Sequence, residues 1–154
     1  MGTFLKKSLI RVSGISQLLL LALILGLGMP SVGNAQDIMT AASRIENKFR
    51  SDAKYLRAAN QLINLDLWGK CMALNLGIVA HEVMAGSIDE RIKAGVAVQL
   101  AFLVIWRKDQ LRQGIPENML DAALKNGQVL LATSPNTIGQ ECGQLNNRLA
   151  QVAN

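Results

Sequence analysis

The sequence has few of the residues that enzymes and metalloproteins use for their chemistry. Its 154 residues include one histidine, two cysteines and three prolines, and aromatic residues make up 4% of the chain. It contains no Cys-x-x-Cys motif, no Cys-x-x-Cys-His motif for haem attachment and no pair of histidines. These absences exclude the motif-based zinc, redox and haem sites. We therefore predict no enzyme activity, no catalytic residue, no cofactor and no metal site.

Two chemical alternatives remain open. His81 could act as a general base, but no acidic residue lies at a facing helical position within one or two turns of it. A soft-metal site for copper(I) is the second alternative, and its candidate ligands are Cys71, Met72, His81, Met84 and Cys142. Met72 and Met84 also fit the apolar face of a helix, where methionine is an ordinary core residue.

The first 35 residues have the pattern of an export signal. Basic residues at Lys6, Lys7 and Arg11 precede an apolar run at residues 18–25, and Gly33-Asn34-Ala35 supplies small residues before Gln36. We predict a signal peptide over residues 1–35 and one helical domain over residues 36–154. No cysteine lies near the end of the leader to receive a lipid anchor.

A retained membrane anchor at residues 18–32 is the alternative to cleavage. The strongly apolar run is shorter than the roughly 20 residues of a spanning helix, and Gly26, Gly28 and Pro30 interrupt it. This pattern favours cleavage, after which we expect no stable membrane span.

Removal of the leader changes the charge balance of the chain. The leader contains three of the 16 basic residues and none of the 11 acidic ones, so 13 basic residues remain against 11 acidic ones. A net charge of +2 gives little support to nucleic-acid binding, which the sequence pI of 9.6 would otherwise suggest. We predict no nucleic-acid partner.

Both cysteines, Cys71 and Cys142, belong to the predicted mature chain. In an exported protein such a pair is more often a disulfide than two free thiols. A disulfide between them would close a loop of roughly 70 residues, which stabilises a fold by about 4 kcal/mol in the chain-entropy model. Two buried, reduced thiols are the alternative.

Apolar residues recur at helical spacing along the whole mature chain. The pattern predicts one helix over residues 37–66, a second over 67–84 and a third over 88–112, whose apolar run at 94–106 is typical of a central buried helix. A fourth helix should begin near Pro116 and end at Asn126-Gly127, a further turn or two could follow over residues 128–133, and a last helix should follow Ser134-Pro135. The expected fold is an all-α bundle of four to five helices with one inter-helix disulfide.

The clearest candidate binding surface is a basic stripe on the first predicted helix. Arg50, Lys54 and Arg57 recur at steps of four and three, and could face an acidic partner, anionic lipid headgroups or a polyanion. A solvated face is the simpler interpretation, because Glu46 and Asp52 dilute the positive charge.

These observations favour a small exported binding protein of the bacterial envelope, either periplasmic or secreted, whose partner is another envelope or secreted protein. A secretion-system or envelope-assembly partner, an inhibitor or immunity-type protein and a chaperone-like protein all suit the pattern. The alternative is a carrier of a small apolar ligand or lipid, which would use the apolar surplus near Phe102 and Trp106. The sequence leaves the oligomeric state open.

Overall fold

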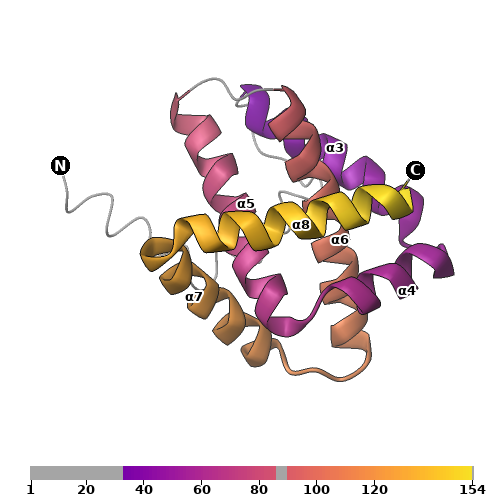
Figure 1. Cartoon of the computed structure of the whole chain (residues 1–154). Coiled ribbons are helices and arrows are strands. Elements are labelled where there is room, and N and C mark those ends of the chain that lie inside the picture. The colour runs from indigo at the N-terminus through magenta and orange to yellow at the C-terminus, as the bar shows by residue number, and fades with distance from the viewer. Residues whose placement is uncertain (1–32, 86–89, 154) are drawn as a thin grey trace.

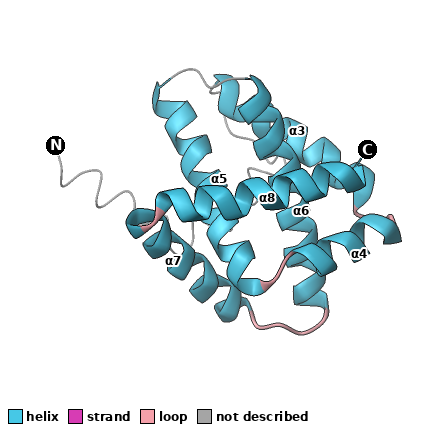
Figure 2. Cartoon of the chain, viewed as in Figure 1, coloured by secondary structure: helices cyan, strands magenta, loops and turns pink. Residues whose placement is uncertain are grey.

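A computed structural model describes residues 33–85 and 90–153 of the chain, and most of these residues are helical (Figures 1 and 2). The helices are α3 (Gly33–Phe49), α4 (Ala53–Leu62), α5 (Leu65–Ala85), α6 (Glu90–Arg112), α7 (Glu117–Thr133) and α8 (Pro135–Ala153). The described residues form no strand. The all-α class is therefore confirmed, although residues 33–85 and 90–153 form six helices where four to five were expected. Nearly all of the predicted signal peptide lies outside the described residues, so it stays a prediction.

Helix α6 forms the centre of the bundle. Its residues 99–106 are all buried, as are Val96 and Ala97. α3 packs mainly against α6 and α7 mainly against α5, while α8 crosses in front of α5 and α6 (Figure 1). The prediction of a central buried helix is confirmed, because a segment that is apolar on all sides is stable only when other helices surround it.

The single helix predicted over residues 37–66 is wrong, since the chain turns at residues 50–52. Asp52 accepts a hydrogen bond from the backbone N of Lys54 at 2.8 Å and so caps the start of α4. The turn also brings the rings of Phe49 and Tyr55 together, with centroids 3.9 Å apart. A local cap and an aromatic contact thus end α3, although no glycine or proline is present.

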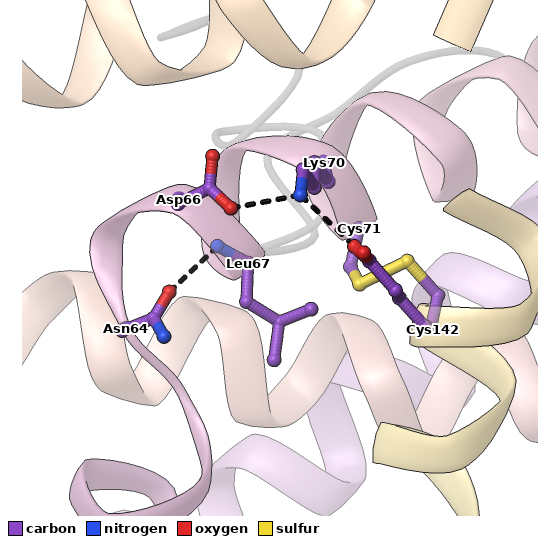
Figure 3. A network of polar contacts seen from close by, with 7 residues as sticks. Asn64, Asp66, Leu67, Lys70, Cys71 and Cys142 are labelled. Atoms are coloured by element: carbon purple, nitrogen blue, oxygen red, sulfur yellow. Dashed lines mark hydrogen bonds and ion pairs between the residues drawn. A yellow bond between two sulfur atoms is a disulfide. The ribbon is translucent and has the colours of Figure 1, made fainter. Parts of the chain in front are cut away.

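A second break separates α4 from α5. Ile63 is buried and Asn64 accepts a hydrogen bond from the backbone N of Leu67 at 2.8 Å, which caps the first turn of α5 (Figure 3). The axes of α4 and α5 are bent by 98° at this point. The start of the second predicted helix is therefore nearly correct, and its cap is Asn64.

Gly127 does not end the fourth helix, contrary to the sequence prediction. α7 continues to Thr133, and Gly127 is buried where α7 crosses α5. A Cβ atom at Gly127 would overlap the carbonyl group of Gly69 and would lie 2.8 Å from the backbone N of Lys70. A Cβ atom at Gly69 would likewise overlap the backbone carbonyl group of Ala123. The glycine therefore permits close helix packing here and does not act as a C-terminal stop.

The remaining helix boundaries agree with the sequence. Gly114, with φ of 93°, follows the end of α6 in a conformation that glycine adopts readily. α8 begins at Pro135. Its Ile138, Cys142, Leu145 and Leu149 recur at helical spacing and are buried, and Val152, at the end of the same stripe, is partly buried.

No single helix among residues 33–85 and 90–153 is long and apolar enough to cross a bilayer. The segments Ala53–Leu62 and Leu65–His81 reach the required length and hydropathy only as a pair, across the 98° bend between them.

Candidate functional site

The three cations predicted to share one helix face lie on two different elements. Arg50 is in the turn after α3, whereas Lys54 and Arg57 lie three residues apart on α4. All three are exposed. Only Lys54 and Arg57 keep the shared helical face, because the break at residues 50–52 ends the continuous helix on which the stripe was based.

Two more exposed cations precede them on α3. Arg44 and Lys48 are one helical turn apart on the outer side of this helix. We call residues 44–57 the basic segment, and its five cations are Arg44, Lys48, Arg50, Lys54 and Arg57.

The acidic residue Glu46 lies inside the protein and does not dilute the exposed charge of the basic segment. Its side chain is only 2% exposed, and Oε1 accepts a hydrogen bond from Lys108 Nζ on α6 at 2.7 Å. Its Oε2 is buried without a hydrogen-bond partner among the described residues. Lys108 therefore compensates the charge of Glu46 within the bundle. Removing this lysine would leave a buried charge, which is strongly destabilising.

Asp52 is the only exposed carboxylate of the basic segment. It acts as the cap of α4 through its bond to the backbone of Lys54, without forming an ion pair with any lysine or arginine of the described residues. Asp52 lowers the net positive charge of this surface by one.

Cations elsewhere in the described chain are often paired with acids. The ion pairs outside the basic segment are Lys70 with Asp66 and Glu141, Lys93 with Glu90, and Arg107 with Glu117. By contrast, none of the five cations of the basic segment lies within ion-pair distance of a described carboxylate. Apart from Asp52, the acids of the described residues therefore leave the exposed charge of this segment uncompensated.

An aromatic cluster lies under the turn of the basic segment. The rings of Phe49 and Tyr55 lie 6.1 and 6.2 Å from the ring of Phe102 on α6. Lys48 Nζ is 5.2 Å from the centroid of the Phe49 ring, and Lys54 Nζ is 5.3 Å from that of Tyr55. These cation–π contacts restrict where the two ammonium groups lie.

Helix α4 is joined to the C-terminal part of α6 by a set of side-chain amides. Asn60 donates a hydrogen bond to Asp109 Oδ2 at 3.0 Å and accepts one from Gln110 at 3.0 Å. Gln113 donates a second hydrogen bond to Asp109 at 2.6 Å. These hydrogen bonds fix the orientation of α4 relative to α6. They therefore also fix where Lys54 and Arg57 lie on the surface.

The predicted disulfide is supported by the structure. Cys71 on α5 and Cys142 on α8 are buried and bonded to each other, with Cα atoms 5.5 Å apart (Figure 3). Neither cysteine is free, so the alternative of two reduced thiols does not describe this structure. The bond joins α5 to α8 where α8 crosses in front of it (Figure 1).

Two buried amides reinforce the disulfide. Gln99 on α6 donates a hydrogen bond to the carbonyl oxygen of Cys142 at 2.7 Å. Asn75 donates to the carbonyl oxygen of Cys71 at 2.7 Å and to Gln99 Oε1 at 2.6 Å. The network connects α5, α6 and α8 at one point and pairs polar groups that would otherwise be costly to bury.

Lys70 adds an ion pair beside the disulfide. Its Nζ lies 2.8 Å from Asp66 Oδ2 and 3.0 Å from Glu141 Oε2 (Figure 3). Hydrogen bonds to Asp66 and then to Glu141 raise the pKa of Lys70 above its ordinary value, and partial desolvation opposes this shift. The pair contributes to the contact between α5 and α8.

The residues of the two chemical alternatives are not gathered into one site. His81 is exposed on α5, Met72 is buried in the core, and both cysteine sulfurs are used in the disulfide. The side chain of Met84 lies outside the described part. Within that part, no three or more His, Cys, Asp or Glu side chains are grouped as metal ligands would be.

Several polar residues of structural importance are missing from the sequence-based expectations. Burial of Glu46 follows from its position four residues after Ala42 on the apolar side of α3, a spacing that the sequence does contain. By contrast, Asn75 and Asn60 have no distinguishing local pattern, because Gln99, Asp109 and Gln110, to which they are hydrogen-bonded, lie on α6.

No protein-family model matches the sequence, and comparison with curated proteins and with solved structures finds no significant match.

Proposed function

We propose that the chain is an exported binding protein of the bacterial envelope, and that Arg50, Lys54 and Arg57 contact a protein partner. The observation that carries this proposal is the absence of any ion pair between these exposed cations and the acids of the described residues. An uncompensated charged surface on a rigid scaffold provides steering and specificity toward a partner of opposite charge.

Export is supported by two independent features. The leader over residues 1–35 has the composition of a signal peptide, and the buried Cys71–Cys142 bond is of a kind that persists in oxidising compartments. A periplasmic or secreted location accounts for both features.

The structure gives less support to the carrier alternative. The rings of Phe102 and Trp106 are 0% and 4% exposed. Phe102 lies in the cluster with Phe49 and Tyr55, and Trp106 stacks on Trp68 with centroids 6.1 Å apart. Core packing thus uses the residues that a ligand would have contacted. Among the envelope roles, an assembly partner, an inhibitor and a chaperone-like protein all require a protein-binding surface.

Site-specific photo-cross-linking in exporting cells tests the proposal. A photoreactive amino acid at Gln61, an exposed position one turn after Arg57 on α4, should capture a defined envelope protein without removing any cation. The same amino acid at Asn126 is the matched control, because this exposed position lies on α7, on the opposite side of the bundle in Figure 1. Absence of an adduct at Gln61, or an equal adduct at Asn126, would refute the proposal.

Charge reversal then links the adduct to the cations. The double substitution Lys54→Glu and Arg57→Glu should remove the adduct at Gln61 while the circular dichroism spectrum is unchanged, since both side chains are exposed. An adduct of undiminished yield would show that the partner does not use these residues.

A further inference from the structure

Each of the two acids within the basic segment already has a role in the fold. Glu46 is buried against Lys108, and Asp52 caps α4. With Glu46 compensated by Lys108, the five exposed cations are opposed on the surface by Asp52 alone. Folding thus makes this surface more positive than the composition of the segment predicts.

The charge of the mature chain is concentrated in this segment. Residues 44–57 contain five basic and two acidic residues, whereas the rest of residues 36–154 contains eight basic and nine acidic ones. The protein is therefore polarised, with positive charge on α3 and α4 and a nearly neutral remainder. Such a polarised molecule orients its positive side toward a negative surface as it approaches.

Extending the proposed function and resting on it, we infer that the whole basic segment, including Arg44 and Lys48, docks on an acidic face of the protein partner. These charges are held in place before binding. Lys48 and Lys54 form cation–π contacts, and the side-chain hydrogen bonds of Asn60 fix α4 against α6. Side chains that are already held in position lose less conformational entropy on association. Fixed charges of this kind are suited to binding discrete carboxylates on an acidic face of a protein.

A protein partner fits this surface better than a lipid bilayer does. Stable attachment to a bilayer surface generally combines basic residues with apolar side chains that insert between the lipids. The large hydrophobic residues exposed in the described part are Ile92, Met119 and Val129, and they lie on α6 and α7. Phe49 is buried and Tyr55 is partly buried, so the basic segment presents charge without an apolar anchor.

Fluorescence anisotropy with the purified exported protein and a fluorescent oligoglutamate peptide tests this inference. An uncharged Gly-Ser peptide of the same length is the control ligand. We expect binding of oligoglutamate that weakens as salt is added, because the charges are exposed to solvent. The Gly-Ser peptide should not bind.

Paired variants separate the basic segment from net charge. Lys54→Glu with Arg57→Glu should weaken oligoglutamate binding by about tenfold or more. Lys125→Glu with Arg148→Glu makes the same change in net charge at exposed positions on α7 and α8, and should weaken it by less than about threefold. Equal losses in the two variants, or no binding by the parent protein, would overturn the inference.

Neutral substitutions at Asp52 and at two of the cations sharpen the test. Asp52→Asn keeps a capping side chain but removes the opposing charge, so oligoglutamate binding should tighten by about two- to threefold. Lys54→Gln with Arg57→Gln should weaken binding without introducing new negative charge, and unfolding midpoints should confirm that each variant is folded. Unchanged affinity in both variants would contradict the inference.

Vesicles of phosphatidylcholine with and without phosphatidylglycerol provide the competing outcome. If the protein binds anionic vesicles through Lys54 and Arg57 but does not bind oligoglutamate, the surface recognises lipid and the inference is wrong. The proposed function fails separately, through the absence of a cross-linked partner at Gln61 in cells, whatever the purified protein binds.

Discussion

Replacing Gly127 by alanine tests the close crossing of α5 and α7. The added Cβ would meet the backbone of Gly69 and would lie 2.8 Å from the backbone N of Lys70. Backbone atoms in the middle of a helix cannot rotate away as a flexible side chain can, so the two helices must separate. α7 packs mainly against α5, and the separation would therefore disturb much of its interface.

The expected magnitude follows from two opposing effects. Overpacking in a well-packed core costs about 1–3 kcal/mol, whereas alanine in place of glycine favours a helix by about 1 kcal/mol. Because the clash is with backbone atoms of α5 and not with a flexible side chain, we expect the overpacking to exceed the helix gain. Gly127→Ala should lower the free energy of unfolding by about 1–2 kcal/mol.

Two glycines of α8 provide matched controls for this substitution. Gly139 and Gly143 are exposed, and a Cβ at either position would meet nothing within 4 Å. Alanine there should raise the free energy of unfolding by about 0.5–1 kcal/mol. Urea unfolding of the exported protein with its disulfide intact, followed by far-UV circular dichroism, measures all three variants. A midpoint for Gly127→Ala at or above that of the parent protein would refute the reasoning.

Three further predictions concern the disulfide and its surroundings. Cys71→Ser with Cys142→Ser should lower the free energy of unfolding by up to about 4 kcal/mol, and insensitivity of the parent protein's urea midpoint to reductant would contradict this. Gln99→Leu removes the hydrogen bonds of Gln99 to the carbonyl of Cys142 and to the amide of Asn75, and leaves the buried Asn75 amide with only the carbonyl of Cys71 as its partner. It should cost about 1–3 kcal/mol, while adding Asn75→Leu should recover part of the loss in a double-mutant cycle. The raised pKa of Lys70 means that its ion pairs stabilise the fold below the ordinary lysine pKa of 10.5, and that this contribution is lost as pH rises through the raised value. Lys70→Gln should therefore lower the urea unfolding midpoint at neutral pH but not in strongly alkaline solution. If the midpoint differs from that of the parent protein by the same amount at both pH values, the ion pairs do not stabilise the fold.

The helical class and the course of the core were predictable from the sequence. The run at residues 94–106 is apolar on all sides, so only the centre of a bundle suits it, and Val96 to Trp106 on α6 is indeed the core. The stripe from Ile138 to Leu149 defines α8 with equal clarity because it follows the helical period without interruption. An even pair of cysteines indicated the disulfide.

The composition of the candidate surface was predictable, but its arrangement was not. Arg50, Lys54 and Arg57 are exposed as a basic stripe would be. The sequence could not show that the chain turns at residues 50–52, since the turn depends on the packing of Phe49 and Tyr55 on Phe102 as well as on the Asp52 cap.

Local periodicity thus determined the helical class and most of the apolar faces, because a residue's place on a helix depends only on its neighbours along the chain. The disulfide was inferred from the presence of two cysteines in an exported chain. The tertiary structure decided that Glu46 is buried against Lys108 and that Gly127 lies at a helix crossing. It also decided that Gln99 joins the carbonyl of Cys142 to Asn75. Each of these outcomes depends on a partner far away in sequence. The free energy of burying a carboxylate, a glycine or an amide is therefore set by what the other helix supplies.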